Sequence, residues 1–232
     1  MPETIVITGA NRGIGLELAR RYTQDGHRVY ATSRQPEKSK DLAQLAADSD
    51  GRLSLHPLEV TDAKQRDAFA AVLSGVPVDV LINNAGVYPH KGLSFGELDE
   101  ASWLKALNVN TVAPMMMAQL LLPNIADSQR KLVASITSKM GSIADNSSGG
   151  SFAYRASKTA LNSAMRSLAI TLQDQGISVI VLHPGWVQTD MGGPRGLVTT
   201  QQSASKLRAT LDRAGLDESG SFFDLDGSII PW

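Results

Sequence analysis

Short apolar runs alternate with longer amphipathic stretches along this chain, and this alternation restricts the possible folds more than any other feature of the sequence. The first run, residues 4–8 (TIVIT), is continuous and β-branched, as in a strand buried on both faces of a parallel sheet. Further strands are predicted at residues 28–33, 52–56, 78–82, 131–136 and 177–182, and helices at residues 14–25, 37–48, 62–74, 99–124, 153–175 and 201–214. Strands that alternate with helices predict a doubly wound α/β (Rossmann) fold, a mostly parallel sheet with helices on both faces. Because no linker divides the chain, residues 1–232 are predicted to form a single domain.

Composition argues against several classes of function. The formal net charge of −1 provides no basic excess for binding nucleic acid. The chain has no cysteine, which excludes disulfides and zinc–thiolate sites and fits a reducing cytoplasm. No apolar stretch approaches the ~20 residues of a membrane span, and no signal peptide is recognised. Metal-ligand spacing is also missing among the four histidines, which are His27, His56, His90 and His183. The sequence therefore predicts a cytoplasmic protein without nucleic-acid, membrane or metal partners.

A glycine-rich turn follows the first predicted strand directly. Gly9, Gly13 and Gly15 have the spacing G-x-x-x-G-x-G and stand before the first predicted helix. Glycines let the backbone approach a ligand, and the free N–H groups at the start of a helix attract anions. In an α/β chain this arrangement predicts a binding site for the pyrophosphate of a dinucleotide.

The end of the second predicted strand favours NADP(H) over NAD(H). An NAD site commonly has an acidic residue there, which binds the ribose 2′-hydroxyl. This chain instead has Ser33 followed by Arg34, and Arg12 lies within the glycine turn. Because guanidinium groups pair with phosphate bidentately, the two arginines predict recognition of a 2′-phosphate.

Tyr154 and Lys158 stand four residues apart at the start of a predicted helix, so their side chains share one helix face. An ammonium beside a phenol stabilises the phenolate, and we expect it to lower the pKa of Tyr154 from ~10. The pair therefore predicts a general acid or base. The spacing alone also occurs on many ordinary amphipathic helices.

Several motifs follow one another along the chain, namely TGANRGIG at residues 8–15, NNAG at 83–86, NVNT at 108–111, ITS at 136–138, YRASK at 154–158 and PGWVQT at 184–189. Together and in this order they resemble the short-chain dehydrogenase/reductase family over nearly the whole chain. More narrowly, residues 141–154 and the ending GSIIPW resemble the C-factor and sniffer-like carbonyl reductase branch.

The resemblance implies a role for each matching residue. The catalytic residues would be Asn110, Ser138, Tyr154 and Lys158. Tyr154 would give a proton to a carbonyl oxygen that Ser138 also binds. Lys158 would hold the nicotinamide ribose, and Asn110 would anchor a water that feeds protons to it. Cofactor binding would involve Gly9, Asn11, Arg12, Gly13, Ile14, Gly15, Arg34, Glu59, Val60, Asn84, Ala85, Gly86, Tyr154, Lys158, Pro184, Val187 and Thr189.

Some positions depart from the family pattern or leave alternatives open. Ser138 precedes Tyr154 by a few more residues than usual, through a polar insert at residues 145–151 (DNSSGGS) that should loop out beside the site. Glu59 replaces the aspartate that commonly contacts the adenine amine. Asn108 is an alternative to Asn110, although the following TVAP favours Asn110. Two tryptophans would either line the substrate cleft or be buried as core rings, namely Trp186 and Trp232.

The predicted function is hydride transfer between NADP(H) and a small-molecule carbonyl or alcohol, by a homodimer or homotetramer. A C-factor-like signalling or binding protein that retains the cofactor fold is the alternative. The complete set of four catalytic residues favours the enzyme. Residues 190–204, rich in Gly, Thr and Gln, offer few apolar anchors, so we expect a poorly ordered lid that closes over cofactor and substrate.

Overall fold

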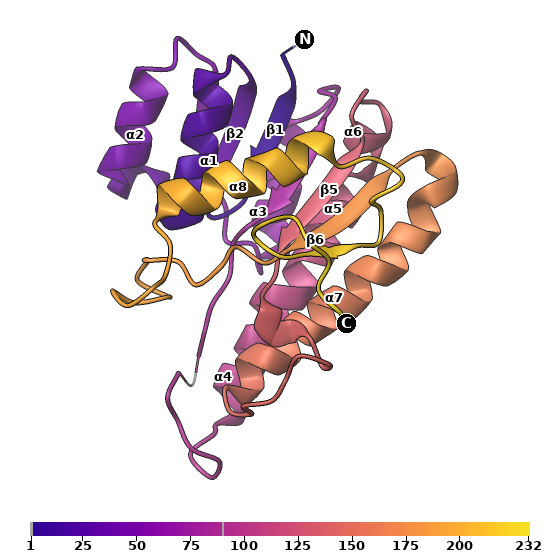
Figure 1. Ribbon diagram of the computed structural model, residues 1–232. Helices are drawn as coiled ribbons and strands as arrows, with labels where there is room; N and C mark the ends of the chain where they lie inside the picture. The colour runs from indigo at the N-terminus through magenta and orange to yellow at the C-terminus, as the bar shows by residue number, and fades with distance from the viewer. Residues whose placement is uncertain (1, 90) are drawn as a thin grey trace.

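The computed structural model describes residues 2–89 and 91–232 and is built around one seven-stranded sheet (Figure 1). His90, one of the four histidines considered above, lies outside the described residues. The strands are β1 (Thr4–Ile7), β2 (Arg28–Ser33), β3 (Leu53–Pro57), β4 (Val80–Asn83), β5 (Leu132–Ile136), β6 (Ser178–Leu182) and β7 (Phe222–Phe223). Their order is β3-β2-β1-β4-β5-β6-β7, and all neighbours are parallel. The order reverses between β1 and β4, where a doubly wound sheet opens a ligand crevice.

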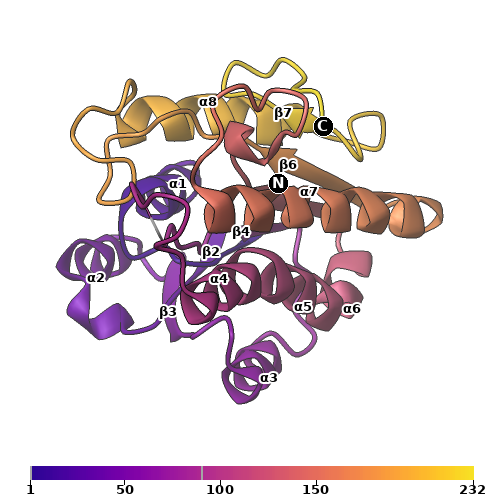
Figure 2. The ribbon, with the colours of Figure 1, turned by 90° about the horizontal axis from the view of Figure 1, so that it is seen from below.

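Helices cover both faces of the sheet, with α1 and α8 on one side and α3, α4 and α5 on the other (Figure 2). The bounds are α1 (Gly13–Gln24), α2 (Lys40–Ala47), α3 (Ala63–Val72), α4 (Glu100–Leu107), α5 (Ala113–Leu120), α6 (Leu122–Ala126), α7 (Phe152–Leu172) and α8 (Thr200–Arg213). Side chains alternate along a strand, so Ile5 and Ile7 join one core cluster and Val6 joins the other. The predicted α/β fold is confirmed. In the described part of the chain, no helix is long and apolar enough to cross a bilayer.

The helix predicted at residues 99–124 is wrong as a single element, because the structure divides it into α4, a π-helical segment η2 (Asn108–Val112), α5 and α6. The N–H of Ala113 bonds to the carbonyl of Asn108, five residues back. Pro114 has no N–H and so cannot continue the α-helical pattern. The wide turn brings the side chain of Asn110 inside, where it is fully buried.

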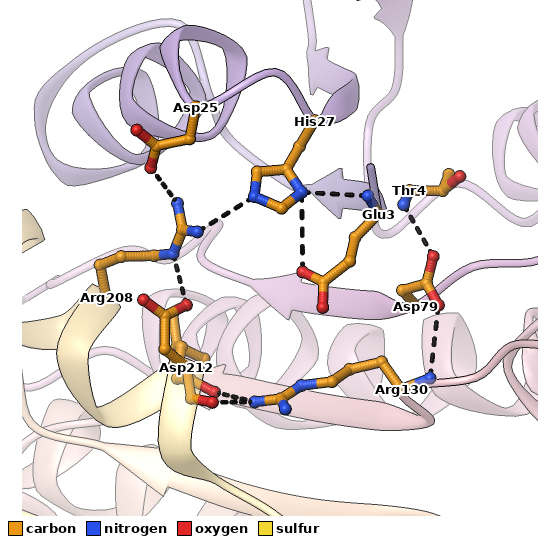
Figure 3. Close-up of polar contacts among 9 residues, drawn as sticks. Glu3, Thr4, Asp25, His27, Asp79, Arg130, Arg208 and Asp212 are labelled. Carbon is orange, nitrogen blue, oxygen red and sulfur yellow. Dashed lines mark hydrogen bonds and ion pairs between the residues drawn. The ribbon is translucent and has the colours of Figure 1, made fainter. Parts of the chain in front are cut away.

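Helix α8 is held against α1 by polar contacts at the end of the sheet where the strands begin (Figure 3). The Arg208 guanidinium bonds to Asp25 at 2.9 Å and to Asp212 at 2.6 Å. It also lies 3.9 Å from the ring centroid of Tyr22 and 3.2 Å from Nε2 of His27. Because α8 follows the segment after β6, this cluster fixes one end of that segment.

Candidate active site

A cavity of about 1100 Å³ lies at the ends of the strands opposite that cluster. Predicted site residues that line it are Gly9, Asn11, Arg12, Gly13, Ile14, Arg34, Glu59, Val60, Asn84, Ala85, Gly86, Tyr154, Lys158, Pro184 and Thr189. Gly15, Val187, Asn110 and Ser138 are not among its lining residues. A cavity of this size exceeds a typical drug-sized pocket and has room for an extended cofactor.

The glycine turn is shaped by close backbone packing. Gly9 and Gly13 have φ values of 67° and 59°, in the left-handed region that favours glycine. A Cβ on Gly15 would lie 2.5 Å from Nδ2 of Asn84 and 2.6 Å from the carbonyl oxygen of Gly9. Gly15 therefore lets α1 pack against the turn, and it is not among the residues that line the cavity. Its role as a cofactor contact stays a prediction.

Asn84 supports the turn with its side chain. Its Nδ2 donates to the carbonyls of Thr8 at 2.9 Å and Gly9 at 3.0 Å. The hydroxyl of Thr8 accepts from the backbone N–H groups of Asn84 and Ala85. Thr8 was missed as a site residue, although its place before Gly9 in the motif was the available signal. Glu59 lines the cavity, with one carboxylate oxygen accepting from Thr61 at 2.9 Å.

A second, basic hollow of about 850 Å³ adjoins the cavity beside the end of β2. Both are lined by Arg12 and Arg34, and the hollow also by Lys38 and Lys40. The Ser33 hydroxyl, at the boundary of the two, is buried and has no hydrogen-bond partner among the described residues. Asp41 is the one acidic residue among those that line the hollow. An unpaired buried hydroxyl among four cations and a single carboxylate fits a phosphate-bearing ribose. Sequence reasoning missed the two lysines, which follow in the basic stretch after Arg34.

Arg12, which the sequence predicts to bind a 2′-phosphate, already has an anionic partner in this structure. Its guanidinium forms an ion pair with Asp190, in the segment after β6. A short distance away, Lys91 donates to the carbonyl of Met191 at 2.8 Å. The glycine turn and the segment after β4 are therefore both bridged to the segment after β6.

Tyr154 and Lys158 are both buried on α7, and their surroundings correct the predicted pKa shift. Burial raises the pKa of Tyr154 to about 12, and its hydrogen bond with Ser138 opposes this rise. Lys158 Nζ donates to the carbonyl of Ile136 at 2.8 Å and lies 5.9 Å from the Tyr154 ring centroid. Burial lowers the pKa of Lys158 to about 8. The expected lowering of the Tyr154 pKa is wrong for the protein alone, and the phenol is protonated at neutral pH.

Asn110 holds two other parts of the site together. Its Oδ1 accepts from the N–H of Val87, and its Nδ2 donates to the Val87 carbonyl and to Ser157, each at 2.9 Å. The side-chain amide is thereby used within the protein. The role of Asn110 as the anchor of a water stays a prediction. Asn108 is exposed and lines the cavity instead.

An aromatic residue that the sequence did not single out lies directly against Tyr154. The ring of Tyr88 stacks on that of Tyr154, with centroids 4.0 Å apart and planes 16° apart. Its hydroxyl is hydrogen bonded to Ser151 at 2.6 Å. Tyr88 follows the NNAG motif by two residues, and no spacing rule connects it to Tyr154 or Ser151.

The segment after β6 has more anchors than the sequence predicted. The indole of Trp186 donates to the carbonyl of Gly192 at 2.8 Å, and Gln188 donates to the carbonyl of Gly196 at 3.0 Å. Thr189 accepts from the N–H of Gly192. Polar side chains thus take the place of apolar anchors. Closure of the segment over a ligand stays a prediction.

The sequence left open whether the two tryptophans line the substrate cleft or are buried as core rings. Both are partly exposed. Trp186 is 48% exposed and Trp232 is 42% exposed, and neither is among the residues that line the cavity. Trp232 stacks on Phe222 at 5.5 Å. In residues 2–89 and 91–232, no three His, Cys, Asp or Glu side chains are grouped to hold a metal ion.

Comparison with known proteins identifies the family. The family model described as short chain dehydrogenase matches residues 3–197. This chain belongs to the short-chain dehydrogenase/reductase family. This short-chain dehydrogenase is 42% identical to C-signal of Myxococcus xanthus over 167 residues, which are 71% of this chain and 99% of that protein. The predicted resemblance is therefore confirmed.

Solved structures extend the likeness of this short-chain dehydrogenase to its whole length. The carbonyl reductase Sniffer of D. melanogaster superposes with a TM-score of 0.94 at 32% identity, covering 100% of both chains. An NADPH-bound carbonyl reductase from chicken fatty liver gives a TM-score of 0.91 at 31% identity, covering 100% of this chain and 99% of that one. This chain is therefore similar to carbonyl reductases in fold and is an oxidoreductase of their family.

Proposed function

We propose that this protein transfers hydride between NADP(H) and a carbonyl or alcohol substrate, with Tyr154 as the general acid or base. The observation that carries the proposal is a buried Tyr154 whose hydroxyl is hydrogen bonded with Ser138 beside the dinucleotide-sized cavity. A neutral phenol can donate a proton as a carbonyl oxygen becomes an alkoxide. In the oxidation direction the same group would accept that proton.

The neighbouring residues have complementary roles. The hydroxyls of Ser138 and Tyr154 would bind the carbonyl oxygen and stabilise the charge that develops on it. Lys158, buried nearby, would hold a nicotinamide ribose, and Asn110 would anchor a water that feeds protons to it. When bound, the nicotinamide supplies or accepts the hydride.

NADP(H) is the proposed cofactor because of the basic hollow beside Ser33. Arg34, Lys38 and Lys40 line it together with Arg12, and no acid stands at the end of β2 for a ribose 2′-hydroxyl. The chicken relative is NADPH-bound, which supports the same preference.

The test is a panel of carbonyls and alcohols assayed at the nicotinamide absorbance with NADPH and with NADH. We expect NADPH-dependent reduction of at least one carbonyl, and weaker turnover with NADH. The proposal fails if every substrate leaves both cofactors unchanged. A small-molecule substrate, a homodimer or homotetramer and a cytoplasmic location stay predictions, and the oligomer is testable by sedimentation.

The similarity to C-signal favours a second candidate, a signalling or binding protein with the same fold. A pure binding protein has no physical need for Ser138, Tyr154 and Lys158 together, so the enzyme is preferred. Cofactor binding in the cavity without turnover of any substrate would favour the second candidate.

A further inference from the structure

Tyr88 occupies the space against one face of the Tyr154 ring. Aromatic pairs commonly have centroids 4.5–7 Å apart in offset or edge-on arrangements, as a rough guide. At 4.0 Å and 16° the two rings overlap closely, which closes this face of Tyr154 to water and to substrate.

The position of Tyr88 is itself fixed from several directions. Its hydroxyl is hydrogen bonded to Ser151 at 2.6 Å and lies 3.8 Å from the sulfur of Met140. The ammonium of Lys91 lies over its ring, 5.8 Å from the centroid, and also donates to the carbonyl of Met191. Tyr88 therefore cannot serve as an open platform for substrate, since its faces and its hydroxyl are already engaged.

Ser151, which is hydrogen bonded to Tyr88, has a backbone conformation that is unfavourable for a residue other than glycine. Gly149, Gly150 and Ser151 have φ values of 63°, 66° and 48°, so the insert ends in three consecutive left-handed residues. For a residue other than glycine this left-handed conformation persists only where surrounding contacts impose it. Arg155 supplies such contacts by donating to the carbonyl of Gly149 and to the hydroxyl of Ser148.

We propose that Tyr88, held by Ser151 at the end of the insert, is a positioning residue that keeps the Tyr154 phenol oriented toward the reacting oxygen. The inference rests on the proposed function of Tyr154. It also gives the insert a role, because the added residues between Ser138 and Tyr154 end at the residue that holds Tyr88. Catalysis is sensitive to such placement, since a displacement of about 1 Å can cost roughly 10²-fold in rate.

The experiment compares Tyr88→Leu, which removes the stack, with Tyr88→Phe, which removes only the hydroxyl. Tyr30→Leu is the matched control, because Tyr30 stacks on His56 at 5.5 Å, away from Tyr154. The measurements are kcat against pH, the dissociation constant of NADPH, and the ring-carbon resonance of Tyr154 in ¹³C-tyrosine-labelled protein without cofactor.

For Tyr88→Leu we expect kcat to fall about 10- to 100-fold while NADPH affinity stays within about twofold. The Tyr154 resonance should shift, and its titration should move to lower pH because water reaches the uncovered face. The Tyr88→Leu substitution leaves Lys158 in the chain, with its Nζ 5.9 Å from the centroid of the Tyr154 ring in the unsubstituted protein. Tyr88→Phe should keep the resonance and lose no more than about threefold in kcat, and Tyr30→Leu should change neither.

The inference is overturned if Tyr88→Leu keeps the wild-type kcat, resonance and titration, or if Tyr30→Leu causes the same losses. If Tyr88→Leu does not fold, Ser151→Ala replaces it, with a smaller shift of the same resonance expected and no shift overturning the inference. A wild-type protein that reduces no carbonyl would contradict the proposed function, whereas the resonance measurements would still decide the position of Tyr154.

Discussion

Single side chains at this site act through their surroundings as much as through their own chemistry. Burial raises the pKa of Tyr154 and lowers that of Lys158, so the phenol holds its proton and the ammonium loses its proton more readily. Both shifts come from the cost of a charge in a low-dielectric interior. The proposed proton donor is therefore in its donating form before substrate binds.

Tyr154→Phe keeps the ring and its stack on Tyr88 but removes the proton. Since general acid catalysis is worth about 10²–10⁴-fold, kcat should fall at least 10²-fold, while NADPH binding measured by fluorescence titration persists. Turnover at the wild-type rate would show that another group supplies the proton.

Arg34→Ala tests the choice of cofactor. Loss of one charge-assisted hydrogen bond to a 2′-phosphate costs roughly 1.5–3 kcal/mol, or about ten- to a hundredfold in NADPH affinity. NADH affinity should change little, and Ser33→Asp added to this variant should turn the preference toward NADH. Arg12 is engaged by Asp190, so any compensation by Arg12 requires that ion pair to open. Equal weakening of both cofactors would contradict phosphate recognition by Arg34.

Helix α8 and the segment before it show how elements transmit stability to the site. The capping box at Thr199 begins the helix, and Ser203 donates to the carbonyl of Pro184 at 2.7 Å. The cluster around Arg208 in Figure 3 holds the helix further along. The cavity wall at Pro184 therefore depends on how α8 docks.

Arg208→Ala should lower the free energy of unfolding by about 1–3 kcal/mol, because it removes two ion pairs and a cation–π contact from a side chain that is 14% exposed. Urea unfolding followed by circular dichroism measures the loss. Arg28→Ala, at an exposed position on β2, is the control and should change stability by less than about 0.5 kcal/mol. An equal effect of both substitutions would mean that the cluster contributes nothing specific.

Within the lid predicted at residues 190–204, residues 200–204 form the start of helix α8, so only residues 190–199 are expected to respond to ligand. The glycine amides of residues 190–199 bond to residues three or four positions back in the chain, for example Gly193 to the carbonyl of Thr189 at 2.7 Å, which allows local opening. Hydrogen exchange of these amides should slow when NADPH and a substrate analogue are added, with the amides of β5 as internal reference. Unchanged exchange would remove the lid interpretation.

For the molecule as a whole, two partly buried histidines link stability to pH. Burial lowers the pKa of His183 to about 4, against opposing influence from Asp224, and burial also lowers the pKa of His56. Between pH 6.5 and 4 the unfolded chain binds more protons than the folded one. The free energy of unfolding must therefore fall as the pH falls through this window. Above pH 6.5 the contribution of the two histidines to stability is fully present.

We expect His183 to account for about 2 kcal/mol of lost stability between pH 7.5 and pH 5. Urea unfolding at both pH values measures the difference. His183→Gln removes the titrating group and should flatten the pH dependence. A wild-type protein equally stable at both values would contradict the buried, neutral state of His183.

Local sequence was sufficient for the parts of this protein that depend on periodicity and motif spacing. Six strands, the glycine turn and the Tyr154–Lys158 pair on one helix were predictable because each lies within a few residues of chain. The two-residue strand β7 and the π-helical break at Asn108–Val112 were not, since the first is too short for a periodic signal and the second depends on a wide turn around Pro114.

The folded chain was needed for everything that depends on burial or on contacts between distant segments. Local spacing predicted a lowered pKa for Tyr154, but the interior that surrounds the ring raises it. Tyr88 and Ser151 are 63 residues apart, and Arg12 and Asp190 are 178 apart, yet each pair is in contact. No periodicity encodes such pairs, because they form only when parallel strands bring their following loops to one end of the sheet.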